Sequence, residues 1–100
     1  MNAHLSFDRD ALADLCRRHY IRRLALFGSV LKGTAGADSD IDFLVEFIHG
    51  KEPGLIRLAG IEASLSALFG GRRVDLRTVQ DLSEHFRAEV LRSAEVQYAA

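Results

Sequence analysis

Two aspartates separated by a single residue, Asp40 and Asp42, begin an alternating segment at residues 40–47 (DIDFLVEF). Side chains two positions apart on a β-strand point to the same side, so both carboxylates project together while Ile41 points into the core. Two such charges about 5 Å apart repel each other by roughly 3 kcal/mol at an effective dielectric constant of 20. A divalent cation removes this repulsion, and oxygen ligands on a rigid strand suit Mg²⁺. The pair therefore predicts a metal site.

Gly28 and Ser29 follow an apolar segment at residues 22–27 (RRLALF), which is predicted to be a short buried strand. If this strand runs antiparallel to residues 40–47, its end lies beside the two aspartates, whereas a parallel pairing separates them by about 20 Å. Gly28 lets the backbone approach a phosphate closely, and Ser29 with the following amides can hydrogen-bond phosphate oxygens. Lys32 is either a further phosphate contact or a solvated loop side chain.

A third carboxylate, Asp75, lies in a short alternating segment at residues 73–77 (RVDLR) and is expected to point away from its apolar face. If this strand pairs beside residues 40–47, Asp40, Asp42 and Asp75 converge on one edge of the open face. Three such acids can hold two metal ions, one activating an attacking hydroxyl and the other holding a triphosphate. The competing interpretation is that these are ordinary solvated acids on exposed strand faces.

Apolar spacing predicts helices at about residues 7–19, 55–69 and 82–97. Asp81 and Glu84 resemble a capping box for the last helix, and the residues near Tyr98 are expected to fray. The apolar stripe of the last helix is expected to join the core: Leu82, Phe86, Val90 and Ala94. The order of elements predicts a small α/β (α+β) fold, with a mixed sheet, its first two strands antiparallel and helices packed on one face.

The bulk composition favours one domain, residues 1–100, because 100 residues with 48% apolar side chains can form a single core. Thirteen Lys plus Arg against fourteen Asp plus Glu give no basic excess, which argues against direct nucleic-acid binding. We find no apolar run near the roughly 20 residues of a membrane span and no export signal. Cys16, the single cysteine, cannot form an internal disulfide, which fits the cytoplasm, and it is expected to pack in the core.

Gly28-Ser29, ten residues, and then Asp40-Ile41-Asp42 resemble the signature of the polymerase-beta-like nucleotidyltransferase superfamily. Residues 26–47 (LFGSVLKGTAGADSDIDFLVEF) followed by residues 71–78 (GRRVDLRT) are similar to the minimal nucleotidyltransferases, the antitoxins paired with HEPN toxins in prokaryotes. The resemblance extends over about residues 21–78, with flanking helices of matching length. It implies the nucleotidyltransferase fold.

The resemblance also implies a site and a reaction. Gly28 and Ser29 would bind the nucleotide, and Asp40, Asp42 and Asp75 would be the catalytic Mg²⁺ ligands, with two ions expected. The reaction would transfer AMP from ATP to a tyrosine hydroxyl of a HEPN-type toxin RNase, silencing it within a complex of the two proteins.

This chain differs from the family pattern at two positions after the Gly-Ser pair. Family members often carry Arg directly after the Gly-Ser pair and again two positions on, where this chain has Val30 and Lys32. Only Lys32 keeps the positive charge. The alternative function is therefore a non-catalytic antitoxin that blocks its toxin by occlusion.

Overall fold

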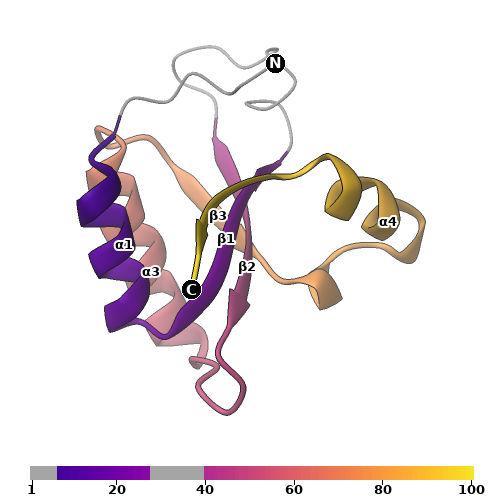
Figure 1. Ribbon diagram of the computed structural model, residues 1–100, viewed down its shortest axis with the longest axis horizontal. Coiled ribbons are helices and arrows are strands. Elements are labelled where there is room, and N and C mark those ends of the chain that lie inside the picture. The colour runs from indigo at the N-terminus through magenta and orange to yellow at the C-terminus, as the bar shows by residue number, and fades with distance from the viewer. Residues whose placement is uncertain (1–6, 28–39) are drawn as a thin grey trace.

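The computed structural model describes residues 7–27 and 40–100. Gly28, Ser29 and Lys32 lie outside the described residues, so their predicted roles stay predictions. The elements are shown in Figure 1 and are, in chain order, α1 (Arg9–Arg18), β1 (Ile21–Phe27), β2 (Ile41–Phe47), α3 (Leu55–Leu68), β3 (Val74–Arg77), the short 3-10 helix η1 (Val79–Asp81), α4 (Glu84–Ser93) and β4 (Glu95–Ala99).

The four strands form one mixed sheet in the order β3-β2-β1-β4. β1 pairs antiparallel with β2, and Phe27 at the end of β1 lies opposite Asp42 at the start of β2. β3 pairs parallel with β2 on its other side, which sets Asp42 beside Asp75. The predicted antiparallel pairing of the first two strands is therefore confirmed, and so is the predicted mixed sheet.

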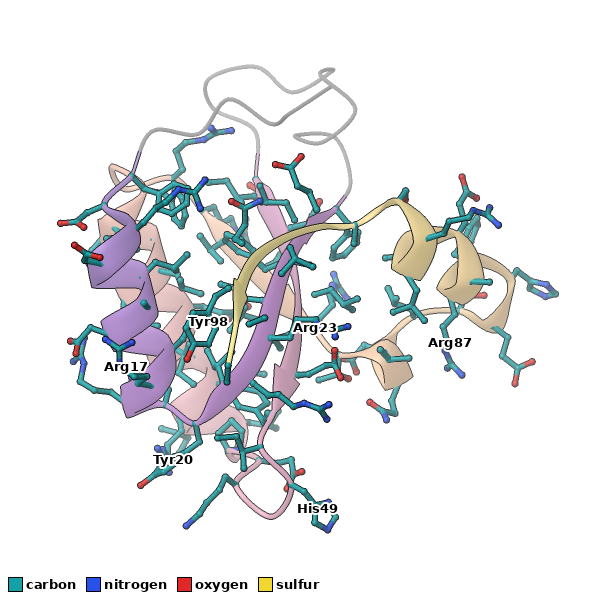
Figure 2. The ribbon with its side chains drawn as sticks, viewed as in Figure 1. Arg17, Tyr20, Arg23, His49, Arg87 and Tyr98 are labelled. Atoms are coloured by element: carbon teal, nitrogen blue, oxygen red, sulfur yellow. The ribbon has the colours of Figure 1, made fainter. Side chains whose placement is uncertain are left out.

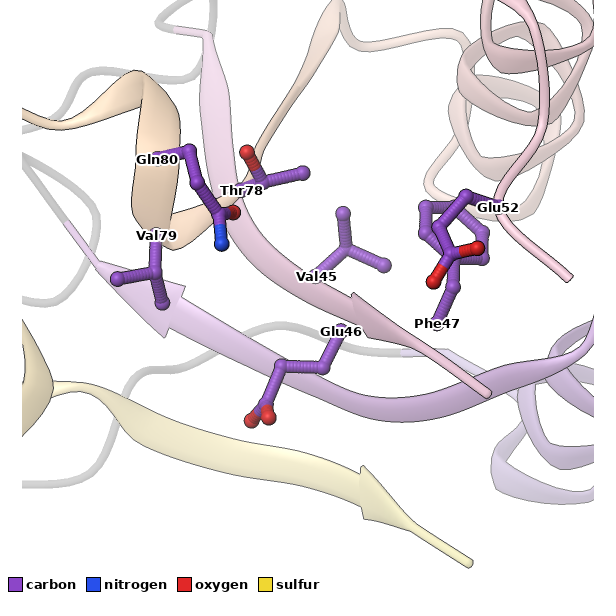
Figure 3. A pocket seen from close by; sticks show the side chains of 7 residues that line it. All are labelled: Val45, Glu46, Phe47, Glu52, Thr78, Val79 and Gln80. Atoms are coloured by element: carbon purple, nitrogen blue, oxygen red, sulfur yellow. The ribbon is translucent and has the colours of Figure 1, made fainter. Parts of the chain in front are cut away.

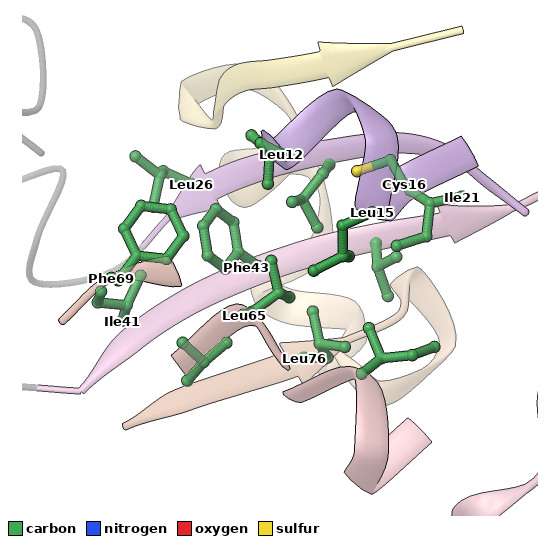
Figure 4. Close-up of a cluster of buried hydrophobic side chains, with 14 residues drawn as sticks. Leu12, Leu15, Cys16, Ile21, Leu26, Ile41, Phe43, Leu65, Phe69 and Leu76 are labelled. Atoms are coloured by element: carbon green, nitrogen blue, oxygen red, sulfur yellow. The ribbon is translucent and has the colours of Figure 1, made fainter. Parts of the chain in front are cut away.

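The hydrophobic core lies between one face of the sheet and the two helices α1 and α3 (Figure 4). Alternation along β2 sends Ile41, Phe43 and Val45 into this core, where each is at most 1% exposed. Phe43 packs against Phe69 at the end of α3, with ring centroids 5.6 Å apart. The remaining core side chains come from both helices and from every strand except β4: Leu12, Leu15, Cys16, Ile21, Leu24, Leu26, Ile61, Leu65, Val74 and Leu76.

Both core helices have defined ends. The Asp8 carboxylate caps α1 by accepting hydrogen bonds from the backbone N–H groups of Asp10 and Ala11, at 3.0 and 3.1 Å. α3 ends before Gly70 and Gly71, whose φ angles of 73° and 85° lie in the left-handed region that glycine adopts without steric cost. The sequence-based boundary of α3 is therefore confirmed.

The C-terminal quarter differs from the prediction of one helix over residues 82–97. The observed capping box joins Thr78 and Asp81 in η1, and Ser83 is the N-cap of a shorter α4 that ends at residue 93. Residues 95–99 (EVQYA) then form β4, which pairs antiparallel with β1. The free edge of β1 accounts for this, because pairing satisfies backbone groups that a frayed terminus would leave to water.

The position of α4 also differs from the expectation that its apolar stripe joins the core. Figure 1 shows α4 on the opposite side of the sheet from α1 and α3. None of its residues is buried, and Phe86 is 61% exposed. Arg87, labelled on α4 in Figure 2, ties this helix to the segment before it. Its guanidinium donates to the carbonyl oxygens of Val79 at 3.1 Å and Leu82 at 3.2 Å.

Candidate active site

Two of the three predicted acids are neighbours on the face of the sheet that α1 and α3 leave uncovered. Asp42 on β2 and Asp75 on β3 are partners in the parallel register, and their flanking residues point into the core on the other face. Directly paired residues project on the same side of a sheet, so the two carboxylates share one surface. Both are half-buried, as is Asp40, which immediately precedes β2.

Burial and the neighbouring charges both shift the pKa of Asp42. Burial raises the pKa of Asp42 above its ordinary value, and repulsion from Asp75 and Asp40 raises it further. The guanidinium of Arg77 lowers the same pKa in opposition. The arrangement therefore gathers negative charge that a cation would stabilise.

The described side chains do not form a complete metal centre by themselves. Across residues 7–27 and 40–100, no group of three or more His, Cys, Asp or Glu side chains has the geometry to hold a metal ion. The register places Asp42 beside Asp75, and the charge of Asp40 acts on Asp42, which is as far as the structure brings the three acids together. Metal ligation by them remains a prediction.

The sequence predicts a single site only if the end of β1 lies beside the start of β2, and the described end of β1 does so. Phe27, which directly precedes Gly28 in the sequence, lies opposite Asp42 across the antiparallel ladder. The carboxylate pair and the end of β1 thus occupy the same end of the sheet.

The nucleotidyltransferase domain family matches this chain over residues 9–96. This chain belongs to that family. Protein adenylyltransferase MntA of Thermococcus cleftensis is 39% identical over 79 residues, covering 79% of this chain and 77% of that protein. A provisionally assigned protein adenylyltransferase of Methanocaldococcus jannaschii is 31% identical over 77 residues, covering 77% of this chain and 80% of that protein.

Solved structures agree with this assignment. A provisionally assigned minimal nucleotidyltransferase has a TM-score of 0.69 and 41% identity, over 86% of this chain and 85% of that one. A toxin–antitoxin structure with AMP-PNP has a TM-score of 0.71 over 93% of this chain and 74% of that one. Its 21% identity makes it evidence for the fold alone. The predicted nucleotidyltransferase fold and enzyme class are confirmed.

Two residues near the acids of this nucleotidyltransferase were not found from the sequence. Arg77 lies two positions after Asp75 on β3, and that spacing could have placed it on the same face. Glu62 on α3 accepts a hydrogen bond from the Leu76 backbone N–H to Oε2 at 2.8 Å, which anchors the outer edge of β3. The contact links residues 14 positions apart, and no local pattern in the sequence signals it.

Two other groups are structural. Cys16 is fully buried, and burial raises the pKa of its thiol to about 12, which confirms the expectation of a packed side chain and not a nucleophile. His19, at the end of α1, has its pKa lowered by burial and by the nearby charges of Arg18 and Arg57. Among the helices of the described ranges, none is long and apolar enough to cross a membrane.

Proposed function

We propose that this nucleotidyltransferase is an antitoxin that transfers AMP from ATP to a tyrosine hydroxyl of a partner HEPN-type toxin. The observation that carries the proposal is the register of Asp42 and Asp75 on the uncovered face of the sheet. Two relatives that are named protein adenylyltransferases support the choice of a protein acceptor. The toxin–antitoxin neighbours support the choice of a toxin as that protein.

Asp40, Asp42 and Asp75 are the proposed Mg²⁺ ligands. Their chemistry fits this ion, because carboxylate oxygens are its preferred protein ligands and because Asp42 lies beside Asp75 in the register. When bound, two Mg²⁺ ions would neutralise charge on the triphosphate and polarise the reacting groups. We propose Gly28, Ser29 and Lys32 as the contacts to the triphosphate, on the basis of their types and spacing.

The proposed transfer is a displacement at the α-phosphorus of ATP. The tyrosine oxygen forms a new bond to this phosphorus, the bond to the bridging oxygen breaks, and pyrophosphate leaves. The hydroxyl proton is proposed to pass to the Asp75 carboxylate, which the register places beside Asp42. The acceptor must approach from the uncovered face, because α1 and α3 block the other one.

The remaining assignments extend the same proposal. We treat residues 1–100 as one minimal nucleotidyltransferase domain, in keeping with a family match over residues 9–96. We place its complex with the toxin in the cytoplasm, with nucleotide and toxin as ligands and without direct nucleic-acid binding.

The decisive experiment incubates the purified chain with Mg²⁺, ATP and the toxin, and then measures the intact mass of the toxin. The wild type is expected to add the mass of AMP, and Asp42→Asn is expected to slow the addition at least about 100-fold. Asp14→Asn is the matched control, because Asp14 lies on α1 in an exposed pair with Arg18 at 3.1 Å.

The same assay separates catalysis from occlusion. If Asp42→Asn neutralises the toxin fully and no mass is added by either protein, the transfer proposal is wrong and the chain acts by binding alone. Addition of AMP to a residue other than tyrosine, found by peptide mapping, would overturn the proposed acceptor only.

A further inference from the structure

A cavity of about 350 Å³ lies at the end of β2 that is remote from the acids (Figure 3). Val45, Glu46 and Phe47 of β2 line it on one side, and residues 78–80 of the segment that follows β3 line it on the other. Glu52, from the loop between β2 and α3, closes a further side. We call this cavity the edge pocket.

The backbone of β2 has unused hydrogen-bonding capacity inside the edge pocket. The Ile41 N–H donates to the Arg73 carbonyl oxygen at 2.8 Å, which shows that the backbone groups of Ile41 point toward β3. Because these directions alternate along a strand, the N–H and C=O groups of Val45 and Phe47 point toward the same side. The backbone of Ile48, one residue further on, points the other way, because its N–H donates to the Tyr20 carbonyl oxygen on the β1 side.

The β2–β3 ladder stops before it reaches these groups. Its last pair is Leu44 with Arg77, and the chain then leaves the sheet to form η1. Within residues 40–100, no backbone hydrogen bond from the η1 segment to Val45 or Phe47 is formed. Val45 is only 1% exposed, so its carbonyl is covered. The half-buried Phe47 leaves its own N–H and carbonyl as a short open strand edge that faces the edge pocket.

The charge of the edge pocket is acidic. Its lining includes the carboxylates of Glu46 and Glu52 and no Lys or Arg side chain. Glu46 forms an ion pair with Arg23 at 3.4 Å on the face of the sheet, while Glu52 is exposed and has no ion pair among the described residues. Thr78 and Gln80 add polar groups, and Val45, Phe47 and Val79 add apolar surface.

We propose that the edge pocket binds an extended basic segment of a partner protein, which adds to β2 as a short strand. One residue of the segment would donate to the Phe47 carbonyl and accept from the Phe47 N–H, as in other cases of strand addition at an open sheet edge. A Lys or Arg side chain of the segment would pair with Glu52, and a neighbouring apolar side chain would fill the cavity. The site is separate from the acids and does not depend on the transfer reaction.

The test uses the full chain, labelled with ¹⁵N, and a capped hexapeptide of alternating valine and lysine as the probe. We expect the peptide to shift the Phe47 amide signal and to slow its hydrogen exchange at least about 10-fold, while the Asp42 and Asp75 signals stay in place. N-methylation on alternate residues gives two versions of the peptide, or N-methyl registers, that keep its charge but can pair as a strand along one edge only. The version whose methyl groups replace the N–H groups facing β2 is expected to lose binding.

Variants of the chain separate charge from backbone pairing. Glu52→Lys is expected to weaken peptide binding at least about 10-fold, because it reverses the charge that faces the basic side chain. The matched control is Glu89→Lys on α4, another exposed acid that lies outside the edge pocket, which should bind as the wild type does. Binding that survives both N-methyl registers, or shifts confined to other surfaces, would overturn the proposal.

Discussion

Asp42 and Asp75 face the same side of the sheet as direct partners across the parallel ladder of β2 and β3. Burial and the charge of Asp75 together raise the pKa of Asp42, so the uncomplexed protein carries an electrostatic cost at this pair. The pair is therefore suited to binding a cation, and without a cation it lowers the stability of the folded protein.

Replacing one acid of this pair should therefore raise stability and abolish activity together. We expect Asp75→Asn to raise the Tm of the metal-free protein by roughly 2–5 °C, given that about 1 kcal/mol moves the Tm of such a domain by roughly 4–8 °C. AMP transfer should fall at least about 100-fold. Thermal unfolding with and without Mg²⁺ and ATP checks both parts. A lower Tm in the metal-free variant would show that the Asp75 carboxylate makes favourable contacts instead.

Glu62 is expected to hold β3 in the place where Asp75 can meet Asp42. Its carboxylate accepts the Leu76 N–H at 2.8 Å, and losing a hydrogen bond to a charged group costs about 1.5–3 kcal/mol. Glu62→Ala should therefore lower the free energy of unfolding by roughly this amount in urea titrations. Glu62→Gln keeps an acceptor oxygen and should lose about half as much or less. Equal losses in the two variants would contradict a role for the hydrogen bond.

His19 is expected to make stability depend on pH near neutrality. Its folded pKa lies below the ordinary value of 6.5, because burial and the charges of Arg18 and Arg57 disfavour the protonated ring. Between these two pKa values the unfolded chain binds a proton that the folded chain does not, so stability falls as the pH drops through 6.5. The fall ends once the folded state is also protonated.

Urea unfolding from pH 8 to pH 5 measures this dependence. His19→Gln should flatten the curve between pH 7 and the lowered folded pKa. His49→Gln, in the exposed loop after β2, should keep the wild-type curve. If stability falls equally in the wild type and in both variants, the pH dependence comes from groups other than His19.

Two isoleucines on α3 give a matched test of which helix face supports the fold. Ile61 is fully buried against the sheet, whereas Ile56 is 90% exposed. Ile61→Ala should lower the free energy of unfolding by about 2–5 kcal/mol, because it leaves a cavity in the core. Ile56→Ala should change it by no more than about 0.5 kcal/mol. A large loss at Ile56 would mean that this face is covered by another surface in solution.

The strands that carry the acids could be predicted from the sequence because their signals are local. Alternation over residues 40–47 sends Ile41 and Phe43 inward and Asp42 outward, and the same rule applied to residues 73–77 places Asp75 outward. The antiparallel pairing of β1 and β2 followed from requiring that their ends meet.

The C-terminal segment could not be predicted in the same way. Residues 82–97 contain apolar side chains at helical spacing, yet Phe86 and Leu91 stay exposed on α4, and residues 95–99 form β4. The free edge of β1 decided this outcome, and that edge exists only in the assembled sheet. Tyr98 accordingly packs against the core and does not fray.

The sequence alone determined the residue types of the site, its strand positions and the family of the chain, because these depend on spacing within a few residues. The tertiary structure alone decided that Asp42 and Asp75 are register partners, that Glu62 anchors Leu76, and that the β2–β3 ladder ends where the edge pocket opens. Each of these joins segments far apart in the chain. Their relation depends on how strands pair and where a ladder stops, which no local pattern specifies.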